Sequence, residues 1–131
     1  MEAVQKALSI DGKCANAWLN KGNIHEEAGE PGEALKCYEK AKSIAPRLAG
    51  AFTNLGNLKY LQGAYEDACF EYLTALEIDA DDGETLGNLG LALGYTVYKD
   101  YATIAFEEAL SCDPGSEEVM RNYLYFLLEE Q

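Results

Sequence analysis

Apolar and polar positions along the chain recur with a fixed step of 34 residues. Several residue types each keep their own place in that step: Asn20, Asn54, Asn88 and Asn122; Gly22, Gly56 and Gly90; Ala34, Ala68 and Ala102; Tyr38, Tyr72 and Phe106. A column of large apolar residues follows the same period: Trp18, Phe52, Leu86 and Met120. A repeat of this length predicts a stacked array of units rather than one globular core.

Each period contains two apolar stripes at helical spacing. In residues 49–82 the first stripe covers 49–62, and a second follows after Gly63-Ala64. This pattern predicts a pair of helices joined by a turn, which must stack on its neighbours to bury both stripes. The expected units are 15–48, 49–82 and 83–116, with the second helix of a partial unit at 1–14 and a terminal helix at 117–131.

The glycines stand inside predicted helices, where glycine costs about 1 kcal/mol relative to alanine. We interpret Gly22, Gly56 and Gly90 as inward-facing, opposite the alanines of the second helices, so that two backbones approach closely. In the third unit, Val97-Tyr98-Lys99 replaces the glycine turn, which predicts a distorted or extended helix end there.

Charge is distributed unevenly along the chain. The net charge is −13, and residues 60–131 carry sixteen acidic but only two basic residues. This excess argues against nucleic acid or an anionic membrane as partner and favours a basic partner segment. The alternative is that the charge only keeps a helical surface soluble. The chain has neither an apolar run long enough to span a membrane nor a recognisable secretory signal, so we expect neither.

Candidate chemistry is sparse. The four cysteines, Cys14, Cys37, Cys69 and Cys112, are widely spaced, which predicts reduced thiols in the cytoplasm rather than a zinc site. His25 is the only histidine and lies on the same stripe as Trp18 and Gly22, so a packing role is favoured over that of a catalytic base. With no nucleophile–base pair and no phosphate-binding loop, the sequence predicts no enzyme activity, no metal and no cofactor.

The repeat resembles the tetratricopeptide repeat family. In the first unit the resemblance rests on Trp18, Gly22, Ala34, Tyr38, Ala41 and Pro46, and the later units match at the same phases. It implies an all-α, right-handed α-solenoid of antiparallel helix pairs, whose first helices line a concave groove that binds a peptide or a partner protein. The groove residues implied are Asn16, Asn20, Asn23, Asn54, Asn57, Asn88, Leu91, Arg121 and Asn122.

An asparagine amide offers donors and an acceptor, so it can pair with the backbone of an extended peptide whatever its sequence. The row resembles the asparagine ladder in the repeat region of O-linked N-acetylglucosamine transferase. The alternative is that asparagine here merely suits the family's fold. Family members that bind acidic chaperone tails carry basic residues beside two asparagines. The corresponding positions here are Leu19, Glu84 and Asn88, so we expect no binding to such tails.

The terminal helix contains the apolar run from Tyr123 to Leu128. A solvated cap should have a polar outer face, so Leu124, Leu127 and Leu128 are a candidate assembly surface, covered by further protein or by another chain. Three hypotheses for function follow. The first is a non-catalytic scaffold that binds proteins within a larger protein or assembly. The others are an accessory targeting region of a larger enzyme such as a glycosyltransferase, and a homo-oligomerisation module.

Overall fold

The structure, a computed structural model, describes residues 13–129. Helices follow the 34-residue period throughout these residues. The elements are α2 (Lys13–Glu27), α3 (Pro31–Ile44), α4 (Ala49–Leu61), α5 (Tyr65–Ile78), α6 (Gly83–Leu93), the short 3-10 helix η1 (Lys99–Tyr101), α7 (Ala102–Cys112) and α8 (Glu117–Glu129). The predicted partial unit at 1–14 falls mostly outside the described residues, and its last two residues belong to α2 instead.

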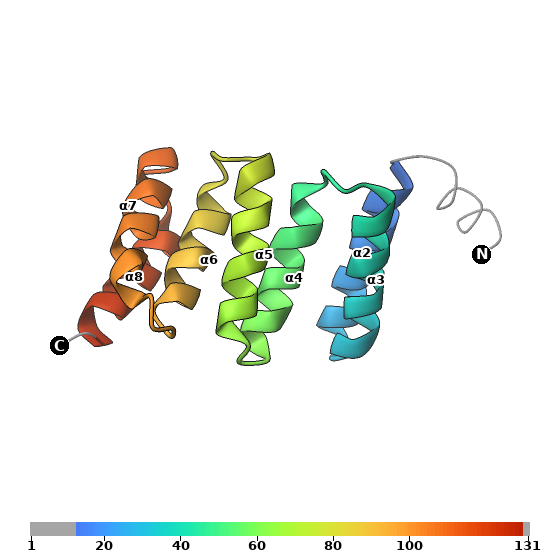
Figure 1. Cartoon of the computed structure of the whole chain (residues 1–131), viewed down its shortest axis with the longest axis horizontal. Helices are drawn as coiled ribbons and strands as arrows, with labels where there is room; N and C mark the ends of the chain where they lie inside the picture. The colour runs from blue at the N-terminus through green and yellow to red at the C-terminus, as the bar shows by residue number, and fades with distance from the viewer. Residues whose placement is uncertain (1–12, 130–131) are drawn as a thin grey trace.

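Consecutive helices pack as pairs, α2 with α3, α4 with α5 and α6 with α7. The pairs then stack through α3 on α4 and α5 on α6, and α8 closes the row against α6 and α7. Figure 1 shows the pairs standing side by side along the long axis, with α2 and α3 at one end of the row and α7 and α8 at the other. Within the described residues the fold is all-helical, as the sequence predicts, and none of these helices is long and apolar enough to cross a membrane.

The repeated aromatic residues form the centre of each pair. Tyr38, Tyr72 and Phe106 are almost completely buried. The glycines face these rings rather than the alanines that we expected. A methyl group on Gly56 would lie 2.5 Å from Cε1 of Tyr72, and one on Gly22 would lie 2.4 Å from Cε1 of Tyr38. Glycine is therefore needed because an aromatic ring from the second helix occupies the space of its side chain.

The turn inside the third unit differs from the other two. Gly29 and Gly63 end their turns with φ of +77° and +81°, a conformation that glycine adopts readily. The equivalent position is Val97, for which this conformation is costly because of its branched side chain. The expected distortion is present, but the helix is shortened rather than extended: α6 ends at Leu93, and the second helix begins with the 3-10 turn η1.

The large apolar column is broken at its last member. Met120 is 43% exposed, whereas the adjacent Val119 is 4% exposed and packs with Phe126 against Phe106. Val119 and Phe126 stand at the phases of the buried Thr85 and Ala92, so α8 turns toward the preceding unit the same face as α6 does. Met120, at the phase of Leu86, lies on the side of α8 that no helix of the described residues covers.

Candidate functional site

Asparagine side chains join successive first helices. Nδ2 of Asn54 donates to Oδ1 of Asn23 at 3.0 Å, and Nδ2 of Asn88 donates to Oδ1 of Asn57 at 3.1 Å. Each pair links one repeat to the next, and its members are half-buried. The structure thus brings together four of the predicted groove residues in two equivalent pairs.

Two of these asparagines also contact buried tyrosines. The hydroxyl of Tyr38 lies 2.7 Å from Oδ1 of Asn23, and the Tyr72 hydroxyl donates to Oδ1 of Asn57 at 2.5 Å. In the third unit Phe106 has no hydroxyl, and the equivalent of these asparagines is Leu91, which packs against the cluster around Phe106. Asn57 accepts from a buried hydroxyl, whereas the Tyr38 hydroxyl also donates to Oε1 of Glu26 at 2.5 Å and so does not depend on Asn23 alone. Asn23 and Asn57 thus contact a tyrosine in addition to any contact with a ligand.

The other phase carries asparagine in every unit and has no tyrosine hydroxyl to satisfy. Asn54 and Asn88 keep their Oδ1 acceptors available after donating through Nδ2. Asn20 is exposed. Asn122 is half-buried, and Leu91 stands at the phase where the earlier units provide its asparagine partner. Asn16 and Arg121 are exposed on α2 and α8. The amides at the phase of Asn20, Asn54, Asn88 and Asn122 are thus not engaged by the buried tyrosine hydroxyls.

The asparagine row ends in an acidic hollow between α6 and α8. A hollow of about 230 Å³ is lined by Asn88 and Asn122 together with carboxylates that include Glu84, Asp113 and Glu118. Burial raises the pKa of Glu84, and the charges of Asp82 and Glu118 raise it further. Negative charge is therefore already unfavourable here, so the hollow suits a cation and disfavours an acidic ligand.

An ion pair connects α4 and α5 in the second unit. Nζ of Lys59 lies 2.8 Å from Oε2 of Glu71, whose side chain is only 5% exposed. His25 occupies the same phase one unit earlier, is largely buried, and contacts Glu30 at 3.1 Å through Nδ1. Sequence reasoning singled out His25 but not its partner Glu30, and the contact supports the packing interpretation of His25 over a catalytic one.

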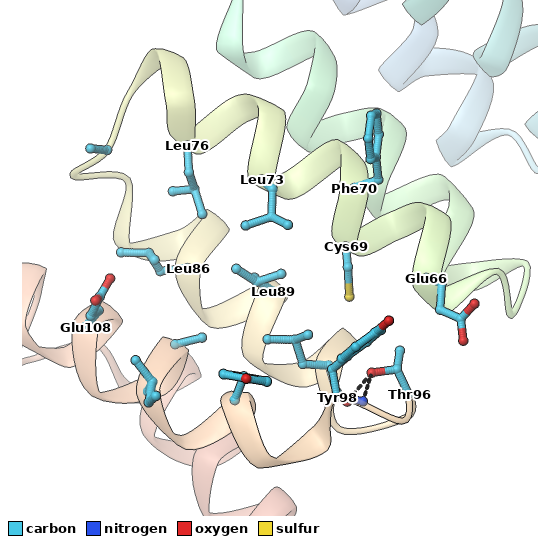
Figure 2. A pocket seen from close by; sticks show the side chains of 15 residues that line it. Glu66, Cys69, Phe70, Leu73, Leu76, Leu86, Leu89, Thr96, Tyr98 and Glu108 are labelled. Atoms are coloured by element: carbon cyan, nitrogen blue, oxygen red, sulfur yellow. Dashed lines mark hydrogen bonds between the residues drawn. The ribbon is translucent and has the colours of Figure 1, made fainter.

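A second hollow, which sequence reasoning missed, lies on the side of the second helices. We call it the α5–α7 groove; it has a volume of about 670 Å³, with α5 and α7 as walls and α6 beneath (Figure 2). Its lining is mostly apolar: Cys69, Phe70, Leu73, Leu76, Ala80, Leu86, Leu89, Leu93, Tyr98, Tyr101, Ile104 and Ala105, with Glu66, Thr96 and Glu108 as its polar members. Phe70 is 70% exposed and Leu73 52%. The signal that could have revealed it was the apolar residues at outward phases of α5.

The tyrosines near the distorted turn separate into two environments. Tyr95 stacks on Tyr65 with ring centroids 4.6 Å apart and also contacts Tyr60 edge to face. Tyr98 and Tyr101 instead line the α5–α7 groove. Tyr95 therefore lies in a different environment from Tyr98 and Tyr101.

The predicted assembly surface on α8 is exposed. Leu124, Leu127 and Leu128 are all accessible, with Leu128 70% exposed. Leu124 stands at the phase of the three packing glycines, where a side chain would collide with an aromatic ring from a second helix of the usual geometry. This face of α8 is therefore different in kind from the packing faces of α2, α4 and α6.

Elements of catalytic or metal chemistry are few in the described residues. None of their His, Cys, Asp and Glu side chains form a group of three or more that could hold a metal ion. Cys37, Cys69 and Cys112 carry free thiols, and burial raises the pKa of Cys37 above its usual range and that of Cys69 to about 11. These buried thiols are poor nucleophiles because the reactive species is the thiolate.

Two curated relatives match most of the chain but only a small part of their own length. A probable UDP-N-acetylglucosamine–peptide N-acetylglucosaminyltransferase SPINDLY from Hordeum vulgare is 31% identical over 116 residues, covering 83% of this chain and 12% of the relative. Protein O-mannosyl-transferase TMTC1 from Mus musculus is 32% identical over 85 residues, covering 62% of this chain and 9% of the relative. The chain thus spans about a tenth of the length of these relatives.

A solved structure has the same fold. The first TPR of Spaghetti (RPAP3), bound to the HSP90 peptide SRMEEVD, superposes with a TM-score of 0.85 at 19% identity and covers 92% of this chain and 98% of that one. The tetratricopeptide repeat pattern itself matches residues 15–48 and 49–82, together just over half of the chain. With its period, its glycine–aromatic packing and these matches, the chain belongs to the tetratricopeptide repeat family.

Proposed function

We propose that this tetratricopeptide repeat domain is a non-catalytic scaffold that binds an extended peptide segment of a partner protein across its first helices. The observation that carries the proposal is the row of amides at one phase, from Asn20 through Asn54 and Asn88 to Asn122. Two of these are held in position by the bonds to Asn23 and Asn57. Amides fixed one repeat apart can contact peptide backbone groups with little loss of side-chain entropy.

The partner segment that suits this face is neutral or basic near its end over α8. The hollow between α6 and α8 combines Asn88 and Asn122 with Glu84 and Glu118, and the pKa of Glu84 is raised. A lysine or arginine of the peptide would relieve this unfavourable accumulation of negative charge.

The test is a selection of random peptides of about 12 residues on the wild-type protein, since a peptide of that length extends over roughly 40 Å. Each selected peptide is then titrated against Asn20→Ala/Asn122→Ala, which leaves both inter-repeat hydrogen bonds intact. We expect weaker binding for peptides of unrelated sequence, because amides that contact backbone tolerate sequence variation. Unchanged affinity for every selected peptide, in this variant and in Asn54→Ala/Asn88→Ala, would overturn the proposal.

Two other roles are supported by particular observations. The likeness to stretches of SPINDLY and TMTC1 favours a place within a larger enzyme, as a region that selects its substrates rather than the part that reacts. The exposed leucines of α8 favour self-association. For any of these roles we propose a reducing compartment such as the cytoplasm, because the buried thiols of Cys37 and Cys69 lie on different helices without a disulfide.

A further inference from the structure

The α5–α7 groove lies on a different side of the molecule from the asparagine row. On α6 the floor residues Leu86, Leu89 and Leu93 lie roughly 100° to 160° around the helix from Asn88, at about 100° per residue. The walls come from α5 and α7, which carry none of the asparagines (Figure 2). A ligand in this groove would therefore not compete directly with a peptide on the first helices.

The apolar walls of the groove are not a requirement of the fold. One repeat earlier, the positions of Phe70 and Leu73 are occupied by Lys36 and Glu39 in the same kind of helix. The positions of Tyr98, Tyr101 and Ile104 correspond, two repeats earlier, to polar or charged residues: Glu30, Glu33 and Lys36. These five apolar side chains are all substantially exposed. Large apolar groups that packing does not need, gathered around one hollow, mark a surface that is covered by something else.

The apolar lining of the groove favours an occupant whose backbone is helical. An extended peptide buried here would need hydrogen-bond partners for its N–H and C=O groups, and an apolar lining supplies few of them. Thr96, the only threonine among the lining residues, already donates from Oγ1 to the Leu93 carbonyl and accepts from the Tyr98 amide. A helix satisfies its own backbone groups internally, so an amphipathic helix can bury its apolar face in this groove without such partners.

The acidic residues around the groove favour basic residues at the two ends of that helix. Glu66 and Glu108 stand near opposite ends of the groove (Figure 2), and none of the described residues that line it is basic. Residues 60–131 carry sixteen acidic and two basic residues. Basic residues at both ends of the incoming helix would be attracted to these ends, whereas a second copy of this acidic half would be repelled.

We propose that the α5–α7 groove is a second docking site, which binds an amphipathic helix with basic flanks from a partner protein. The apolar face of that helix lies on Phe70, Leu73 and Ile104, and its basic ends lie beside Glu66 and Glu108. The domain then holds two segments at once, an extended one on the first helices and a helical one on the second helices.

The probe for this site is a synthetic peptide of about 18 residues, or roughly 27 Å of helix. Leucines form one face of the helix, and two lysines stand at each end. A peptide of identical composition with its leucines distributed around the helix is the control. Binding is followed by fluorescence anisotropy, and its location by NMR of the methyl groups of Leu73, Leu89 and Ile104. We expect saturable binding of the amphipathic peptide only, with shifts confined to these methyl groups.

The principal variant is Phe70→Lys/Leu73→Glu, which installs residues that the first unit already carries at these phases and leaves the net charge unchanged. Because both side chains are exposed, we expect the fold to be retained, which circular dichroism checks. The affinity for the probe should fall about ten-fold or more, as expected when buried apolar anchors are lost. The matched control, Asn20→Ala/Asn122→Ala, should bind the probe as the wild type does.

The acidic ends are tested separately. Glu66→Gln/Glu108→Gln should weaken the lysine-flanked probe and reduce its salt dependence, but leave a glutamine-flanked version unaffected. Equal binding of the two leucine arrangements, or full affinity in Phe70→Lys/Leu73→Glu, would overturn the proposal. So would a mass that rises with protein concentration and becomes constant in that variant, since this would assign the groove to a second copy of the chain.

Discussion

The hydroxyls of Tyr38 and Tyr72 contact two of the asparagines that the resemblance to the tetratricopeptide repeat family assigned to the ligand-binding groove. Asn23 and Asn57 contact these hydroxyls, and Leu91 stands beside Phe106, where the hydroxyl is missing. The side chain at one phase of the first helix thus depends on whether the second helix carries tyrosine or phenylalanine. Single residues in this array are best compared with their equivalents one repeat away.

At the glycine phase, Gly56→Ala should destabilise the fold by about 1–3 kcal/mol, because its methyl group would lie 2.5 Å from the buried Tyr72 ring. Gly32 is a matched control, since nothing lies within 4 Å of a methyl group placed there. Gly32→Ala should therefore leave stability unchanged or raise it by up to about 1 kcal/mol. Urea unfolding of the two variants checks the difference, and equal stability of both would contradict the packing role of Gly56.

The thiols should react in an order set by burial. At pH 8 a disulfide reagent such as dithionitrobenzoate should modify the exposed Cys112 quickly. Cys37 and Cys69 should react only slowly until the protein unfolds, because burial excludes the reagent and raises their pKa values, that of Cys69 to about 11. In Cys112→Ser the rapid phase should disappear; a rapid phase that persists would show that a buried thiol is accessible.

The helix pairs differ in the contact that joins the last turn of the first helix to the second helix. The second unit joins α4 to α5 through Lys59 and Glu71, at positions where the third unit has Leu93 and Ala105. An ion pair and an apolar contact therefore serve equivalent positions in the same array. The two residues at such a contact must therefore suit each other across the helix pair, and the sequence of one helix alone does not determine them.

Removing one member of the ion pair should show this dependence. Lys59→Leu leaves the Glu71 carboxylate buried without its partner and should cost about 3 kcal/mol in the free energy of unfolding. Lys59→Leu/Glu71→Ala reproduces the residues of the third unit and should recover much of that loss. Urea unfolding midpoints measure both. A single variant as stable as the wild type would mean that water, rather than Lys59, solvates Glu71.

Over the whole molecule, charge decides which partners are excluded. The peptide SRMEEVD, bound by the structural neighbour, ends in three acidic residues among its last four. In this chain the hollow between α6 and α8 carries Glu84 and Glu118, and the pKa of Glu84 is raised there. We expect no micromolar binding of SRMEEVD by isothermal titration, and a gain in Glu84→Lys. Micromolar affinity in the wild type would refute the expectation.

Self-association is also a property of the whole molecule. If the exposed leucines of α8 form an interface, the light-scattering mass should rise with protein concentration, and Leu124→Glu/Leu128→Glu should remain monomeric because charge at an apolar interface is costly. Phe70→Lys/Leu73→Glu is the control for the other apolar surface. If the wild type is monomeric at all concentrations, the exposed leucines of α8 do not mediate self-association.

The sequence by itself determined the period, the helix pairs and the family, because a 34-residue repeat of small and aromatic positions permits one way of stacking. It also predicted the disturbed turn at Val97, since a branched residue does not readily replace glycine at positive φ. Only the tertiary structure decided what each glycine faces, which asparagines are engaged by tyrosines, and how far the leucines of α8 are exposed. It also revealed the α5–α7 groove, because Phe70, Leu73 and Ile104 belong to helices that meet only across α6. These properties depend on contacts between side chains many positions apart, and the repeat fixes the spacing of the residues but not which side chains meet at each contact.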